Sequence, residues 1–89
     1  MLSKQREKID QIDKELVRLF EERMQTALEV VAIKKGHGLP VLDSGREAQV
    51  IEKVCSYLND ETLRQPLTEL YTEMMRLSRA YQQKQLDDE

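Results

Sequence analysis

Apolar residues recur along the first third of the chain at the three- and four-residue spacing of one helical face. This stripe comprises Ile9, Ile12, Leu16, Leu19, Phe20, Ala27 and Val30. Neither glycine nor proline occurs over residues 3–35, so we expect one uninterrupted helix there. At about 1.5 Å per residue this helix is roughly 50 Å long, which exceeds the diameter of any globule that 89 residues can form. Part of its stripe therefore needs a second chain to cover it, and we expect self-association.

A shorter second helix is expected after the segment at residues 36–40, which contains two glycines and a proline. Residues 44–57 carry apolar side chains at helical spacing. Ser44 and Glu47 have the spacing of a capping box at the start of this helix, and Asp43 is an alternative cap.

A third helix of intermediate length is predicted over residues 62–85, with Pro66 tolerated only in its first turn. Its apolar stripe comprises Leu63, Leu67, Leu70, Tyr71, Met74, Leu77 and Tyr81. The acidic tail at residues 87–89 is expected to be solvated. The sequence therefore predicts an all-α protein, a single domain over residues 1–89 with a long, a short and a medium helix.

Two cations fall on the apolar side of the first helix. On a wheel of about 100° per residue centred on Leu16, Arg23 lies within about 20° of the centre and Lys34 close to it. Burying an unpaired cation costs several kcal/mol unless an anion or a polar network compensates it. Ion pairs with the chain's own carboxylates, or side chains that extend to solvent, are the alternative interpretation.

The other two helices also turn polar groups inward. Glu47 falls on the apolar side of the second helix, although a capping box would explain its place without a ligand. Ser78 lies inside the third stripe and Gln82 at its edge. A buried serine does not require a ligand, because its hydroxyl can donate a hydrogen bond to a backbone carbonyl one turn back. Taken together, the three helices indicate a buried anion-binding cavity inside a helical bundle.

Composition and motifs narrow the chemistry of such a cavity. The net charge of −3 and the lack of a basic cluster argue against nucleic acid, and no apolar run approaches a membrane span. The N-terminus turns polar at once, and the single Cys55 is expected to be a core thiol, which favours a cytoplasmic protein without disulfides. Metal-ligand spacing and a glycine-rich phosphate loop are missing, and neither His37 nor Cys55 has a catalytic partner nearby. The cavity therefore suits pure binding, or a reaction that needs only positioning and electrostatics, with no metal and no cofactor.

The ordered set of these residues resembles the all-α chorismate mutase family. The matching segments are Arg6-Glu-Lys-Ile-Asp-x-Ile-Asp, Leu19-Phe-Glu-Glu-Arg23, Val30-x-x-x-Lys34, Pro40-Val-x-Asp43-x-x-Arg46-Glu47 and Ser78-x-x-x-Gln82. The opening segment also resembles the mutase domain of bifunctional chorismate mutase/prephenate dehydratases. The resemblance implies the rearrangement of chorismate to prephenate in tyrosine and phenylalanine biosynthesis, without a cofactor. It also implies a homodimer of intertwined helices with two active sites.

The resemblance assigns the carboxylate-binding groups first. Chorismate carries two carboxylates, so Arg23 and an Arg6 contributed by the partner chain would clamp them with bidentate geometry. Arg46 and Ser78 would complete the polar wall near these carboxylates.

The resemblance also implies which residues carry the chemistry. Lys34 and Gln82 would donate hydrogen bonds to the ether oxygen, which gains negative charge as its bond to the ring breaks. Asp43 and Glu47 would hold the ring hydroxyl. The expected catalytic set is therefore Lys34, Gln82 and Glu47.

Two alternatives remain open at this point. An isochorismate pyruvate lyase would share the fold and most of the cations, but the acid-bearing start of the second helix, Asp43-x-x-Arg46-Glu47, favours the mutase. A non-catalytic helical dimerisation module would use the inward cations as structural ion pairs.

Overall fold

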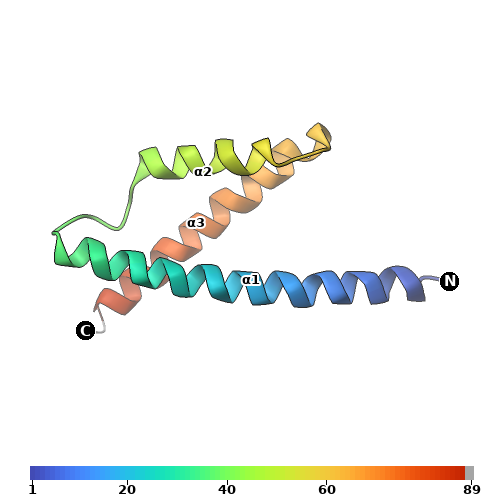
Figure 1. The fold of residues 1–89 in the computed structure, drawn as a ribbon, viewed down its shortest axis with the longest axis horizontal. Coiled ribbons are helices and arrows are strands. Elements are labelled where there is room, and N and C mark those ends of the chain that lie inside the picture. The colour runs from blue at the N-terminus through green and yellow to red at the C-terminus, as the bar shows by residue number, and fades with distance from the viewer. Residues whose placement is uncertain (88–89) are drawn as a thin grey trace.

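The computed structural model describes residues 1–87; residues 88 and 89, which end the acidic tail and the expected domain, lie outside it. Its elements are α1 (Ser3–Gly36), α2 (Ser44–Ser56), a short 3₁₀ helix η1 (Glu61–Leu63) and α3 (Arg64–Asp87). No strand occurs within the described residues. The all-α class and the order of a long, a short and a medium helix are confirmed (Figure 1).

The loop that ends α1 depends on one glycine. Gly38 has a φ of 67°, in the left-handed region that other L-residues rarely adopt. The N–H of Leu39 then returns to the carbonyl of Lys34 at 2.8 Å, which satisfies an acceptor at the end of the helix. This turn redirects the chain toward the start of α2.

The start of α2 corrects one expectation. Asp43, not Ser44, is the N-cap, because its Oδ1 accepts a hydrogen bond from the backbone N–H of Arg46 at 3.0 Å. Ser44 becomes the first helical residue, and Glu47 falls one position beyond the place that a capping box requires. The capping-box interpretation of Ser44 and Glu47 is therefore wrong, and the Glu47 carboxylate points elsewhere.

The start of α3 lies two residues later than expected. Asp60 caps η1 by accepting a hydrogen bond from the backbone N–H of Thr62 at 3.0 Å, so the expected first residues of the helix form a tighter turn. Pro66 then lies in the first turn of α3, where its missing N–H has no partner to lose.

The core within one chain is small and lies along α3, which packs against both α1 and α2. Its buried apolar side chains are Val31, Cys55 and Met75. Cys55 is 2% exposed, so its expected place as a core thiol is confirmed. Figure 1 shows α3 running from the end of α2 to the C-terminal half of α1.

Most of the apolar stripes lie outside this core. Every residue over 1–22 is exposed, including the first five residues of the α1 stripe, and Leu70, Leu77 and Tyr81 of α3 are exposed as well. The inner side of α3 is instead formed by Met75, Ser78 and Gln82. The radius of gyration is 15.9 Å, against about 12 Å for a compact domain of this length. One chain therefore does not bury the faces that its sequence makes apolar.

Among residues 1–87, none of the helices combines the length and apolar character needed to cross a membrane.

Candidate active site

A pocket of about 290 Å³ lies between the C-terminal half of α1, the start of α2 and the C-terminal half of α3. Its volume is at the lower end of the range for small-molecule sites. Seven of the eight residues expected from the sequence line it: Arg23, Lys34, Asp43, Arg46, Glu47, Ser78 and Gln82. Residues up to 59 positions apart in the sequence thus meet in one place.

Two cations of α1 enter this pocket without a carboxylate partner. The Arg23 guanidinium lies over the ring of Tyr71, 5.8 Å from the ring centroid. The Lys34 ammonium donates a hydrogen bond to the backbone carbonyl of Val41 at 3.1 Å. Neither side chain forms an ion pair with any carboxylate among residues 1–87. The alternative interpretation, that these two cations form ion pairs with the chain's own carboxylates, is therefore wrong for residues 1–87.

The seven arginines divide into two groups. Four of them pair with carboxylates: Arg18, Arg64, Arg76 and Arg79. On the surface, hydrogen bonds from the first three lower the pKa of the acceptor carboxyls Glu15, Glu61 and Glu73. Three have no carboxylate partner within the described chain: Arg6, Arg23 and Arg46. Arg6 and Arg23 are the two arginines expected to bind the substrate carboxylates, and Arg46 is the one expected in the polar wall near them.

The α3 side of the pocket is formed by a buried pair of polar side chains. Ser78 is 3% exposed and Gln82 is 9% exposed. The amide Nε2 of Gln82 donates to the Ser78 hydroxyl at 2.9 Å, which fixes the amide plane. An amide nitrogen carries two N–H groups, so one remains for a ligand. The Ser78 hydroxyl is thus held by the Gln82 amide.

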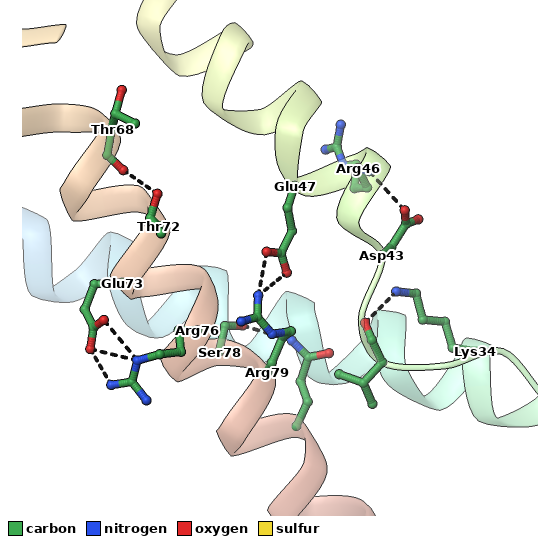
Figure 2. Close-up of polar contacts among 12 residues, drawn as sticks. Lys34, Asp43, Arg46, Glu47, Thr68, Thr72, Glu73, Arg76, Ser78 and Arg79 are labelled. Carbon is green, nitrogen blue, oxygen red and sulfur yellow. Dashed lines mark hydrogen bonds and ion pairs between the residues drawn. The ribbon is translucent and has the colours of Figure 1, made fainter. Parts of the chain in front are cut away.

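The Glu47 carboxylate turns from α2 toward α3, where Arg79 holds it (Figure 2). The Arg79 Nη1 donates to both carboxylate oxygens, with 2.5 Å to Oε2. Arg79 was not among the expected site residues, because on the wheel of α3 it lies opposite the apolar stripe, as a surface residue would. Arg79 reaches the pocket only because α3 packs beside α2, where Arg79 meets Glu47, a residue 32 positions earlier in the sequence.

Arg6 is the one expected site residue outside the pocket. It is exposed and lines a separate recess formed by side chains of residues 1–10. Seventeen positions separate it from Arg23 on one straight helix, a distance of roughly 25 Å along the axis. A single chain therefore cannot bring both arginines to one small ligand.

Comparisons with known proteins bear on the family of the chain. The family profile described as chorismate mutase type II matches residues 5–83. A chorismate mutase from Methanocaldococcus jannaschii is 38% identical over 66 residues, which cover 70% of this chain and 67% of that protein. No solved structure gave a match.

Proposed function

The chain belongs to the chorismate mutase type II family, isomerases that rearrange chorismate to prephenate, and we propose that two copies form two shared pockets for this reaction. The observation that carries the proposal is the collection of unpaired cations around one pocket. Arg23, Arg46 and Lys34 line it without carboxylate partners among residues 1–87. A dianionic substrate supplies the missing counter-charge.

Substrate binding is assigned to the arginines. Arg23 is held against Tyr71, so its planar guanidinium is available as a fork for one carboxylate. Arg46 projects from the first turn of α2 and, with the Ser78 hydroxyl, completes the wall near the carboxylates. The second carboxylate is assigned to Arg6 of a partner chain, because the Arg6 of the same chain is too distant.

The donors to the ether oxygen are assigned to Lys34 and Gln82. The Lys34 ammonium has three N–H groups and uses one on Val41, and the Gln82 amide uses one of its two on Ser78. Both side chains are thus fixed in direction and retain donors. The ether oxygen gains negative charge as its bond to the ring lengthens, so these donors bind the transition state more strongly than the ground state.

The reaction itself needs no group from the protein to form a bond. One carbon–oxygen bond breaks and one carbon–carbon bond forms within the same molecule, and no proton is transferred. Catalysis then consists of holding the compact diaxial conformer and stabilising the developing charge. Glu47, with Asp43 beside it, is assigned to the ring hydroxyl, which is axial only in that conformer.

The homodimer is supported by the faces that one chain leaves uncovered. The α1 residues Ile12, Leu16 and Phe20 are 49%, 58% and 43% exposed, and the molecule extends 54 Å along its longest axis. A second copy that covers this stripe would remove a large apolar surface from water. Two-fold symmetry then brings Arg6 of each chain to the pocket of the other. A cytoplasmic location, in keeping with the unpaired thiol of Cys55, is part of the same proposal.

One assay tests the function. The purified chain is incubated separately with chorismate and with isochorismate, and the products are identified. Prephenate from chorismate is the expected result. Salicylate and pyruvate from isochorismate would identify a lyase instead. If neither substrate gives a product, the chain is a non-catalytic module.

A further inference from the structure

Among residues 1–87, the Arg79–Glu47 ion pair is the one charged contact in the pocket that the assigned roles do not use. It joins α3 to α2 and is about one-third exposed, with side-chain exposures of 31% and 26%. The other ion pairs among residues 1–87 are exposed and lie within one helix or the turn that precedes it. Figure 2 shows the contrast: Arg79 reaches across to α2, whereas Arg76 lies beside Glu73 on its own helix.

We propose that Arg79 is a positioning residue that holds the Glu47 carboxylate in place to accept a hydrogen bond from the ring hydroxyl of chorismate. The inference rests on the proposed function, since it assumes that Glu47 binds that hydroxyl. Arg79 Nη1 contacts both oxygens of Glu47, and each carboxylate oxygen keeps a lone pair for a further donor. The held carboxylate is therefore ready to accept a hydrogen bond without rearranging.

The second effect of Arg79 concerns the unpaired cations of the pocket. A glutamate side chain has several rotamers, and an unheld Glu47 could turn toward Lys34 or Arg46, which line the same pocket. Such a contact would neutralise a cation that the substrate needs. By engaging Glu47 from α3, Arg79 keeps the negative charge on one side of the pocket and leaves the unpaired cations for the carboxylates and the ether oxygen.

The test is a double-mutant cycle between Arg79 and Glu47, measured as kcat/KM for chorismate. Hydrogen bonds to charged groups contribute more free energy than neutral ones, and partial exposure to solvent reduces that contribution. Arg79→Met is therefore expected to lower kcat/KM about tenfold. In the Glu47→Gln background the same change should cost less than about twofold, because no carboxylate remains to be held. Arg79→Lys should stay within about threefold of the unaltered protein, since an ammonium also holds a carboxylate.

The matched control is Arg76→Met, one turn earlier on α3, where the arginine pairs with exposed Glu73 outside the pocket. It should leave kcat/KM within about twofold. Circular dichroism and size-exclusion chromatography check that each variant is folded and assembled. Arg79→Gln is made in parallel with the same expected direction, so that the cycle does not depend on the folding of one variant.

The outcomes separate this inference from the proposed function. Equal losses for Arg79→Met with and without Glu47 would mean that Arg79 contacts the substrate itself or acts independently, and the positioning role would be refuted. No loss in Arg79→Met would refute it as well. If the unaltered protein does not turn over chorismate at all, the proposed function fails and this inference fails with it.

Discussion

Replacing Lys34 is expected to cost more turnover than any other single change in the pocket. Lys34 is half-buried, and its ammonium is anchored on the Val41 carbonyl at 3.1 Å, so its remaining donors have a fixed direction. Loss of one such preorganised donor costs about 10²–10³-fold in kcat, or about 2.7–4 kcal/mol of transition-state stabilisation. Loss of the bond to Val41 lowers the free energy of unfolding by only about 1 kcal/mol.

The assay follows the disappearance of chorismate with Lys34→Ala, Lys34→Met and the unaltered protein under the same conditions. We expect kcat to fall by about 10²–10³-fold while KM changes much less, because the contact with the ether oxygen strengthens mainly in the transition state. Lys53→Met, at an exposed position of α2 outside the pocket, is the matched control and should keep native kinetics. A Lys34→Met protein with near-native kcat would show that Lys34 does not meet the developing charge.

Two further variants test other parts of the site and the assembly. Gln82→Glu should retain activity only toward acid pH, because a carboxyl donates to the ether oxygen only when it is protonated. A flat rate profile from acid to neutral pH would show that Gln82 does not contact the ether oxygen. Leu16→Glu places a charge in the exposed stripe of α1, where the leucine is 58% exposed, and should yield monomers with little activity by sedimentation and kinetic assay. If Leu16→Glu still forms native dimers, the dimer interface does not include the apolar stripe of α1.

The sequence predicted the pocket well where helical periodicity alone determines direction. Arg23 and Lys34 lie on the face that the wheel assigned to them, and Ser78 and Gln82 are buried as their positions within or beside the third stripe indicated. In each case one rigid helix determines where the side chain points, so a period of 3.6 residues is sufficient information.

Contacts between elements were harder to predict. Asp43 and Ser44 are both good caps, and only the path of the preceding loop selects Asp43. Arg79 resembles any surface arginine on its own helix, and its role depends on where α2 lies. The stripes of α1 and α3 were correctly recognised as apolar, but one chain leaves most of them exposed. Helical periodicity cannot say what covers them, and the proposed second copy is the partner that would do so.

The composite site is tested most directly by mixing two inactive proteins, Arg6→Ala and Arg23→Ala. Each should be nearly inactive alone, whereas Arg18→Ala, which removes an exposed arginine paired with Glu15 on the same helix, should remain active. Co-refolding the two variants in equal amounts gives about half mixed dimers, each with one intact site and one doubly defective site, so roughly a quarter of native activity should return. If the subunits demonstrably exchange and no activity returns, Arg6 and Arg23 do not meet in a shared site.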